Sequence, residues 1–565
     1  MNGSISRVGA VGTFATALVV FGACGGNGNG SGFDPGGSSG ASGSSGASGS
    51  SGAFDDGGLL GTSGGTDGSS GGPVGDPVTC EQAALSKSYI GCDYWPTVVA
   101  NNVWSIFDFA AVVANAGQNP ADVTVTGPNG VNQKVTVAPQ QLATIYLPWV
   151  AALKGPDADS AGNATPLSAS VFAAKGAYHL VSSFPVTVYQ FNALEYKGQG
   201  GPSGKNWAAC PAAGGLSCFS YSNDASLLLP STAMTGNYRV AGIHGWTEGG
   251  LLGSTDIMGP YFAVTGTADG TNVKVKVSST GQVVAGGSIA ATAAGGVLSF
   301  TLNAGDVAEI VAPLGQKYDL SGSQVSADKP VQVIAGIPCI NIPQGKGACD
   351  HIEESVLPAE TLGKHYVVTV PTSPHGAPIG HVVRIYGNVD GTKLSYGGGA
   401  PCPGTVNAGQ VLDCGTVSKD FEVTGDHEFS VASFSLGSSV VDANGGQGAM
   451  GDPDQSQMIA VEQFRTKYIF LAPNDYDVNF IDVVAPTDTQ LTLDGTGATA
   501  KFTAVGVAGL GVARIKLAAG QNGAHVITGS KAFGLQVMGY GAQTSYQYPG
   551  GLDLKGIAPP PPPVK

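Results

Sequence analysis

One short stretch gathers several side chains that could do chemistry. Residues 349–354 read CDHIEE, in a chain of which only 12% of residues are charged. If this stretch is a strand, His351 and Glu353 share one face, while Asp350 and Glu354 share the other. Carboxylates and imidazoles are metal ligands and general acids or bases, so the stretch is a candidate site.

Three interpretations of this stretch remain open from its own residues. A metal site built on Asp350, His351, Glu353 or Glu354 would need completion from elsewhere, for example by His365 or His381. A general acid and base pair would need a cleft and a set separation. The third interpretation is a strand entry beside a disulfide, with carboxylates that cap backbone N–H groups or face solvent.

Two other segments repeat the frame of this stretch without its charges, and this favours the third interpretation. Each copy ends in a tyrosine followed by Val or Ile, and the copies align on Pro230, Pro358 and Val461. The other two copies lack the histidine and most of the carboxylates. The segments are 222–240, 349–368 and 452–470. The sequence therefore predicts no catalytic residue, no bound metal and no cofactor.

Weaker candidates lie elsewhere. Residues 452–455 (DPDQ) could offer oxygens to calcium, although this sequence is also a common turn. The aromatic runs 93–96 (DYWP) and 244–246 (HGW) could contact a ligand, but aromatics in β-sandwiches usually belong to the core. The folded region contains no P-loop, HExxH motif, kinase signature or plausible catalytic triad.

The chain predicts an all-β fold built from repeated modules. Val, Thr, Gly and aromatic residues dominate, and no long amphipathic helix is evident. A strand of the TxVxV type recurs at 121–130, 269–277, 390–398 and 487–497. A closing strand after a polar turn recurs at 182–194, 326–339, 425–437 and 529–541.

These repeats predict tandem antiparallel β-sandwich-like modules within residues 79–555. The spacing of roughly 80 to 140 residues exceeds a propeller blade of about 45 residues. A β-propeller-like arrangement is the alternative. The modules are expected at approximately 85–200, 220–345, 350–440 and 452–548.

Eight cysteines follow Cys24 and fall in sequence-local couples. An even number in an exported chain indicates disulfides, and local pairing is the simplest assignment. The expected pairs are Cys80–Cys92, Cys210–Cys218, Cys339–Cys349 and Cys402–Cys414. The modules should therefore be braced by disulfides.

The N-terminal region is expected to export and tether the protein. Residues 1–23 resemble a lipoprotein signal peptide, with Cys24 as the acylated residue after Phe21-Gly22-Ala23. Residues 24–78 then form a disordered Gly/Ser-rich linker, and residues 556–565 form a Pro-rich tail. The expected location is the bacterial cell envelope at the outer membrane or cell surface, with membrane contact through the lipid anchor only.

The charge balance excludes one class of partner. The formal net charge is −15 at pH 7, and an acidic surface repels phosphate backbones. Nucleic-acid binding is therefore not expected.

Several long motifs resemble the N-terminal domain family of IgGFc-binding protein, in lipoproteins of the myxobacterial type. They are YIGCDYWPT (89–97), FAAVVANAGQNPADVTV (109–125), FPVTVYQFNALEY (184–196), FSYSNDASLLLPSTAMTGNYRV (219–240) and CDHIEESVLPAETLGKHYVV (349–368). The resemblance extends from about Ser86 to Tyr548. It implies an extracellular recognition module and supplies no catalytic residue. It does not imply that this chain binds IgG.

The function expected from these features is non-catalytic recognition or adhesion by a tethered lipoprotein. Its partner would be an unknown extracellular protein or glycan. One alternative is a metal-assisted hydrolase that uses Asp350 to Glu354, and another is a purely structural envelope protein.

Overall fold

The computed structural model describes residues 76–565, apart from 116, 196, 214–216, 251–252, 348 and 521–522. The predicted signal peptide, Cys24 and the linker up to residue 75 lie outside the described residues. Within the described part the paired strands are all antiparallel, and no helix there is long and apolar enough to cross a membrane. Its short helices include α1 (Cys80–Ser86), α2 (Ala151–Lys154), α3 (Ser438–Val441), η1 (Pro128–Gly130), η2 (Trp207–Ala209) and η5 (Gly446–Gly448).

Four modules share one topology, in which a closing strand joins an inner sheet to an outer sheet. In the first module the inner order is β5-β2-β7-β8 and the outer order is β4-β3-β7-β1, so β7 belongs to both. The fourth module repeats this as β31-β32-β28-β33-β34 and β30-β29-β33-β27.

The first-module strands are β1 (Gly91–Tyr94), β2 (Phe109–Ala114), β3 (Ala121–Gly127), β4 (Val131–Val137), β5 (Leu142–Leu147), β7 (His179–Asn192) and β8 (Ala225–Leu227). The fourth-module strands are β27 (Arg465–Leu471), β28 (Val478–Pro486), β29 (Leu491–Leu493), β30 (Thr496–Ala498), β31 (Thr503–Val505), β32 (Leu510–Lys516), β33 (Ala524–Gly541) and β34 (Thr544–Pro549).

In the second and third modules a polar turn divides the closing strand in two. The second has the orders β6-β15-β12-β17-β18 and β14-β13-β16-β9, and the third has β23-β20-β25-β26 and β22-β21-β24-β19. The turns are Asp328-Lys329-Pro330 and Asp426-His427-Glu428, where side-chain charge and proline favour a bend over a continuous strand.

The second-module strands are β6 (Val171–Ala173), β9 (Asn237–Arg239), β12 (Tyr261–Gly266), β13 (Thr271–Lys276), β14 (Val297–Leu302), β15 (Val307–Val311), β16 (Gln324–Ala327), β17 (Val331–Ile340) and β18 (Asp350–Ser355), beside the hairpin β10 (Trp246–Gly250) and β11 (Gly253–Met258). The third-module strands are β19 (His365–Val368), β20 (His381–Gly387), β21 (Thr392–Gly397), β22 (Thr405–Val406), β23 (Val411–Val417), β24 (Phe421–Gly425), β25 (Phe429–Ser435) and β26 (Gln455–Gln457).

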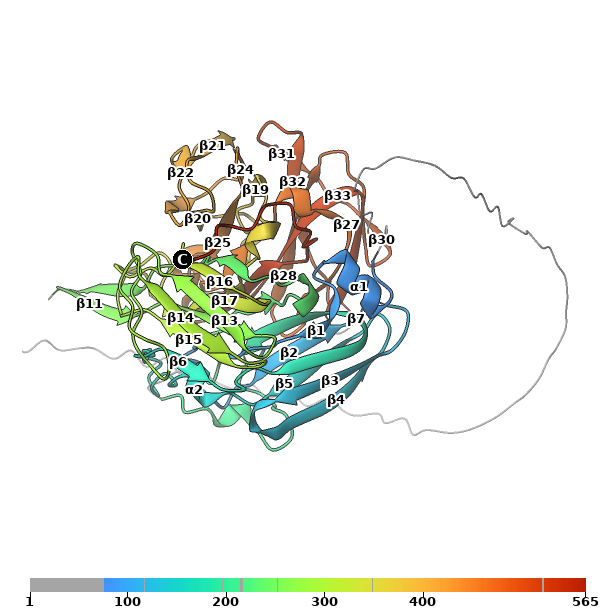
Figure 1. Ribbon diagram of the computed structural model, residues 1–565. Coiled ribbons are helices and arrows are strands. Elements are labelled where there is room, and N and C mark those ends of the chain that lie inside the picture. The colour runs from blue at the N-terminus through green and yellow to red at the C-terminus, as the bar shows by residue number, and fades with distance from the viewer. Residues whose placement is uncertain are drawn as a thin grey trace, which may run out of the picture. The chain divides into compact units, whose positions relative to one another are not determined.

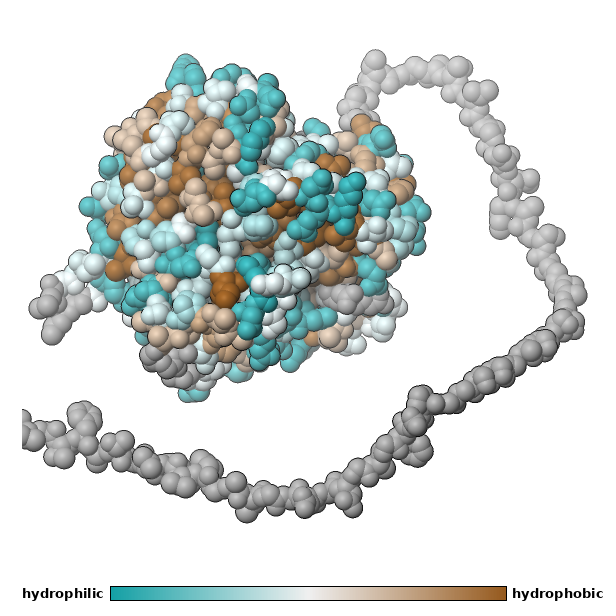
Figure 2. All heavy atoms as spheres, turned by 90° about the horizontal axis from the view of Figure 1, so that it is seen from below, coloured by the Kyte–Doolittle hydropathy of each residue, from teal (hydrophilic) through white to brown (hydrophobic). Residues whose placement is uncertain are grey.

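Hydrophobic patterning explains which sheet lies outside. In β13 the valines are buried and the intervening asparagine and lysines are exposed, which is the period of a strand with one face in water. In contrast, β17 is buried at every position, because both of its faces are covered. Figure 2 accordingly shows hydrophilic residues spread over the face seen there, with smaller hydrophobic patches among them.

A tyrosine hydroxyl fixes the bend of the closing strand in every module. Each hydroxyl donates to the carbonyl where the inner half of the closing strand begins, and interacts with the backbone N–H three residues before the tyrosine. All four side chains are buried, so no water replaces these bonds. The donor and acceptor pairs are Tyr94 and Val186 (2.7 Å), Tyr238 and Val331 (2.6 Å), Tyr366 and Phe429 (2.6 Å), and Tyr468 and Phe533.

The last strand of each inner sheet lies at the centre of the folded unit. We call β8, β18, β26 and β34 the innermost strands. β8 contacts β18, β18 contacts β26, β26 contacts β34, and β34 contacts β8, which closes a ring. In Figure 1 the modules follow one another round this centre, from blue and teal through green and yellow to red. The predicted all-β fold of disulfide-braced sandwich modules is confirmed, and the sandwiches are arranged like the blades of a four-bladed propeller.

The repeated segments 222–240, 349–368 and 452–470 each end one blade and lead into the next module. After the innermost strand, a 3-10 turn begins next to Pro230, Pro358 or Ala460. The tyrosine follows eight residues later in each copy. Ala460, and not Val461, therefore occupies the position of the prolines, which corrects the sequence alignment by one residue. The turns are η3 (Ser231–Ala233), η4 (Ala359–Thr361) and η6 (Val461–Gln463).

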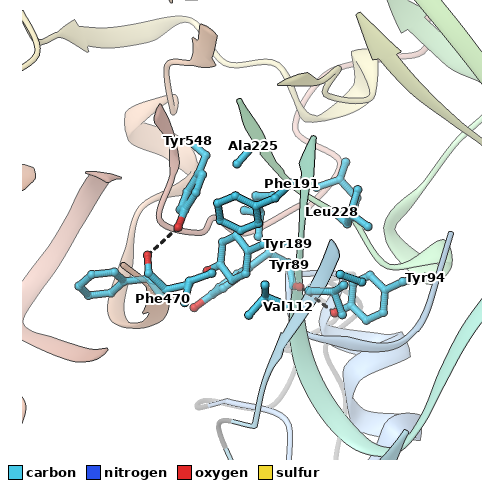
Figure 3. Packing of buried hydrophobic residues seen from close by; sticks show 14 of the residues in the cluster. Tyr89, Tyr94, Val112, Tyr189, Phe191, Ala225, Leu228, Phe470 and Tyr548 are labelled. Carbon is cyan, nitrogen blue, oxygen red and sulfur yellow. Dashed lines mark hydrogen bonds between the residues drawn. The ribbon is translucent and has the colours of Figure 1, made fainter. Parts of the chain in front are cut away.

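The fourth innermost strand returns the chain to the first module. Tyr89 N donates to Leu552 O at 3.2 Å, and Leu554 N donates to Lys87 O at 2.7 Å. Apolar packing continues across this junction in one core cluster. Figure 3 shows part of it, with Tyr89, Tyr189 and Phe191 beside Tyr548, whose hydroxyl donates to the backbone next to Phe470.

Short-range disulfides brace the modules. The structure joins Cys80 to Cys92, Cys210 to Cys218, Cys339 to Cys349 and Cys402 to Cys414. The third of these bonds ties the end of β17 to the start of β18, and so fixes the entry to an innermost strand.

The tyrosine frame predicts a specific loss of stability. Tyr366→Phe should lower the free energy of unfolding by about 1–3 kcal/mol, because the Gly363 N–H and the Phe429 carbonyl lose a buried partner. Urea denaturation would measure the change. The matched control is Tyr396→Phe, whose half-buried side chain donates to Pro403 O at an exposed site. Equal stabilities of the two variants would contradict the role given to Tyr366.

Candidate functional site

The charged stretch singled out in the sequence is β18, the innermost strand of the second module. Asp350, His351 and Glu353 are 0% exposed and Glu354 is 1% exposed. These side chains therefore lie between modules and do not reach the surface. A substrate in solution cannot contact them in this conformation.

The two faces of β18 meet different neighbours. Glu353 faces the first module, where it accepts hydrogen bonds from Gln190 Nε2 at 3.0 and 3.2 Å. On the other face, Asp350 lies near the Asp452 carboxyl of the third module. Two carboxylates also cap their own strand: Asp350 accepts from His351 N, and Glu354 from Ser355 N, each at 2.8 Å.

Asp224, just before β8, joins three of the innermost strands. Its Oδ2 accepts from Glu353 N on β18 and from Gln455 N on β26, both at 3.0 Å. Its Oδ1 accepts from Ala225 N at 2.8 Å. One buried carboxyl group thus satisfies three backbone donors at the centre of the ring, where no water can replace it.

The acids around the axis have pKa values raised by burial. Desolvation raises the pKa of Asp224, Asp350, Glu354 and Asp452 well above the ordinary range. Neighbouring carboxyls reinforce the shift, for example Asp454 beside Asp224 and Asp452 beside Asp350. Along the described chain, no lysine or arginine forms an ion pair with these groups.

Two further acids of this buried group, Glu353 and Asp454, also have raised pKa values. Burial raises the pKa of Glu353 to about 8 and that of Asp454 to about 6, against hydrogen bonds that lower both. Burial also lowers the pKa of His351 to about 3, so this imidazole is neutral. Within the described ranges, no three His, Cys, Asp or Glu side chains are placed to hold a metal ion.

Most of the other sequence candidates lie in the interior, whereas His244 of the HGW run is partly exposed. Asp452 and Asp454 of the DPDQ stretch are buried at the axis. Trp95 is 7% exposed and stacks on His179, with ring centroids 4.2 Å apart. Trp246 belongs to an apolar cluster and donates to Glu248. The aromatic runs therefore serve mainly as core.

A pocket of about 450 Å³ lies at the entry ends of the innermost strands. We call it the axial pocket. Every module contributes to its wall: the first through residues 102–104, 158–164 and 217–222, and the second through the Cys339–Cys349 disulfide. The third contributes Asp452, and the fourth contributes Gln543. Its size is typical of a site for a small ligand or part of a larger one.

Aromatic side chains line one side of the axial pocket. The Trp104 and Tyr221 rings meet edge to face at 6.1 Å, and Tyr221 and Phe219 do so at 5.3 Å. Asn102 and Gln543 add amides to the lining, and Asp452 adds a carboxyl whose Oδ1 has no partner within the described structure. Aromatic faces beside planar polar groups suit a polar, uncharged ligand surface.

Most residues of this pocket could not be found from the sequence. Ser222, Asp350 and Asp452 occupy equivalent positions in the three repeated segments, at or just before an innermost strand, so a correct alignment of the repeats would have placed them at one end of the ring. Phe219 and Tyr221 follow the Cys210–Cys218 loop, which carries no periodic signal. Only the fold shows that this loop reaches the axis.

Fold and site together give a ring of β modules that presents a composite pocket built largely by loops. A family model described as "IgGFc binding protein" matches residues 224–539, more than half of the chain. The chain belongs to the IgGFc binding protein family.

A relative and a solved structure show how far the similarity to known proteins extends. Human IgGFc-binding protein is 35% identical over 153 residues, which are 27% of this chain and 3% of the human protein. The chain thus spans a small fraction of that relative's length. A solved tetra-tandem repeat from the extending region of a large adhesion protein covers 82% of this chain and 99% of its own, at 13% identity and a TM-score of 0.08, too low to bear on the fold.

The bridging role of Asp224 predicts a large effect of its removal. Asp224→Ala should lower the free energy of unfolding by about 2–5 kcal/mol, because several buried N–H groups lose their acceptor. Thermal and urea unfolding would measure it. The control is Asp328→Ala, which removes an exposed carboxylate that accepts a hydrogen bond from Asn272 N. Water can take the place of that acceptor. A loss at Asp224 no greater than at Asp328 would contradict the bridge.

The buried acids also predict how stability depends on pH. The folded-state pKa of Glu353 is raised from 4.5 to about 8, so the folded chain holds a proton that the unfolded chain releases. Stability from this group is therefore lost as pH rises from 4.5 towards 8, and it is constant above and below that window. The melting temperature should fall between pH 5 and pH 8.

Glu353→Gln isolates this contribution, because glutamine cannot ionise. The variant should lose part of the slope, up to about 1.4 kcal/mol per pH unit, and the other buried acids keep the rest. The control is Asp488→Asn, an exposed group whose pKa is lowered by its hydrogen bond with Lys531 and which stays ionised throughout the window. If the stability of the wild type and of Glu353→Gln depends on pH with the same slope, the inference that Glu353 is protonated in the folded state is wrong.

Proposed function

We propose that this protein is a non-catalytic recognition protein that binds an extracellular protein or glycan in the axial pocket. Membership of the IgGFc binding protein family indicates a binding role. The observation that carries the proposal is the pocket itself, which loops of all four modules build at one end of the ring. Loops on a rigid scaffold are the usual position of binding residues.

Burial argues against hydrolysis by the charged stretch. A general acid or a metal-bound water must reach the substrate, whereas Asp350, His351, Glu353 and Glu354 are covered on all sides. We assign them a structural role in β18, one of the innermost strands whose entry ends lie at the axial pocket. The alternative of a purely structural envelope protein does not account for the aromatic lining of the axial pocket.

The proposed location is the bacterial cell envelope, at the outer membrane or cell surface. The support is the lipobox-like sequence at Cys24 and the Gly/Ser-rich segment that follows it. Acylation would hold the chain at a membrane, and a Gly/Ser-rich linker of this composition would let the ring reach a partner. Loss of detergent-phase partitioning in Cys24→Ser would identify the anchor.

The printed name of the human relative states that it binds the Fc part of IgG. The similarity to that relative covers only 27% of this chain. Fc is therefore one ligand to test rather than the expected ligand. A glycan array and a panel of immobilised extracellular proteins, with Fc and Fab fragments among them, would search for the partner.

Filling the axial pocket should abolish the binding that such a screen finds. Ala161 is exposed and lines the pocket, so Ala161→Arg introduces bulk and charge without disturbing the core. Affinity should fall more than about tenfold, as expected when a contact surface is blocked. Phe219→Ala should weaken binding in the same direction, because it removes an aromatic wall.

The matched control is Ala290→Arg, at another exposed alanine that does not line the axial pocket. It should bind like the wild type in surface plasmon resonance. A partner that binds Ala161→Arg and wild type equally would place recognition elsewhere on the protein.

A further inference from the structure

A second cavity, of about 730 Å³, lies between the second and third modules. We call it the inter-module cleft. Its wall contains five basic side chains and one acid, in a protein that carries 25 Lys and Arg against 40 Asp and Glu. The basic residues are Arg239, His244, Lys276, Lys317 and Arg384, and the acid is Asp319.

One of the two arginines is already neutralised. Arg384 on β20 is 4% exposed and pairs with Asp319, which is also buried. Its Nε lies 3.5 Å from Asp413. Its charge is therefore matched within the protein, and it has little attraction left for a ligand.

Arg239, at the end of β9, has no such partner. It is 6% exposed, and no carboxylate in the described part of the chain forms an ion pair with it. One terminal nitrogen donates to Gly322 O at 3.0 Å, while Nε is buried without an acceptor. Burial lowers the pKa of this guanidinium to about 10, and Asp390 offsets the shift only in part. A buried cation with an unfilled donor calls for an acceptor, and the described residues supply none to Nε.

Close backbone packing holds this arginine in position. Gly322 has φ +84°, and a Cβ there would lie 2.1 Å from Gly409 O of the third module. The loops of the two modules thus touch through glycines, and the Arg239 guanidinium lies beside both of them. The donor is part of a fixed wall rather than a free surface side chain.

Two lysines place further positive charge at the cleft. Lys276 on β13 and Lys317 are exposed and line the same cavity, and Lys317 Nζ lies 4.9 Å from the Tyr318 ring centroid. Lysine side chains are flexible and can adjust to the position of a ligand. A guanidinium is planar and can donate two parallel hydrogen bonds to two oxygens. The combination is suited to an oxyanion.

We propose that the inter-module cleft binds a sulfate or phosphate group, with Arg239 as the fixed donor and Lys276 and Lys317 as cations at the rim. The cavity exceeds the volume of the free ion, so it has room for the ion alone or for the same group esterified to a sugar. This site is separate from the axial pocket and does not depend on the function proposed for it.

The test uses the full chain and two kinds of probe. Sodium sulfate and sodium phosphate are compared with sodium chloride at equal ionic strength in thermal melting and calorimetry. A sulfated disaccharide is compared with its unsulfated form. Sulfate or phosphate should raise the melting temperature more than chloride does, and by more in the wild type than in Arg239→Gln, because both ions also stabilise proteins without binding to a site. If only the sulfated disaccharide binds, the ligand is the esterified group; if the free ions bind as well, the ion suffices.

Variants assign the binding to the cleft. Arg239→Gln should weaken binding by about tenfold or more, through loss of a charged, buried donor. Because that variant could also disturb the module junction, Lys276→Gln with Lys317→Gln provides a second test at exposed positions. Lys274→Gln is the matched control, since Lys274 is exposed on the same strand as Lys276 but does not line the cleft.

Two results would overturn the proposal. The first is a wild-type protein that responds to sulfate, phosphate and the sulfated disaccharide no more than to chloride and the unsulfated form. The second is undiminished binding in both variants, the double lysine variant and Arg239→Gln. Ala161→Arg, in the axial pocket, should leave oxyanion binding unchanged, so failure of one proposal does not imply failure of the other.

Discussion

The Asp224 carboxyl group is the contact on which the ring depends. It accepts backbone N–H groups from β18 and β26 as well as from Ala225, so strands that belong to three modules share one acceptor. The innermost strands β8 and β26 are only three residues long, and their own ladders leave donors unfilled at the axis. Three accepted hydrogen bonds favour the ionised form, but burial and the nearby Asp454 outweigh them. Acids thus occupy positions at the axis where apolar side chains would leave the N–H groups of the innermost strands without an acceptor.

Local features of this fold were accessible from the sequence. The polar turn before each closing strand, the alternation within it and the couples of cysteines are all patterns of near neighbours. The repeated tyrosine was visible as well, although its hydrogen bond to the bend was not. The ring could not be predicted from the sequence, because neighbouring innermost strands such as β8 and β18 are far apart in the chain. No sequence periodicity indicates which of these strands contact one another. Each blade also carries a second sheet, which is why the module length argued against a propeller.

Two copies of the repeat show where sequence alignment loses its signal. The third copy has Ala460 where the others have proline, and without that residue the frame moved by one position. The fourth copy, β34 and the residues after it, lacks the Pro and Tyr frame because it connects back to residues 87–89 instead of to a new module. For the charged stretch, residue types gave the correct capping contacts of Asp350 and Glu354 but not their burial. Burial is a property of the whole ring and cannot be read from six residues.

The same burial changes how the charge of the protein should be understood. The formal value of −15 counts every carboxyl as ionised, yet burial raises the pKa of several acids at the axis well above the ordinary range and so favours their neutral form. A neutral acid contributes no monopole, so the negative potential around the modules is weaker than the composition implies. At physiological salt, charges more than about 8 Å apart are largely screened. The cleft that we propose for an oxyanion, lined by Arg239, Lys276 and Lys317, is therefore compatible with an acidic protein.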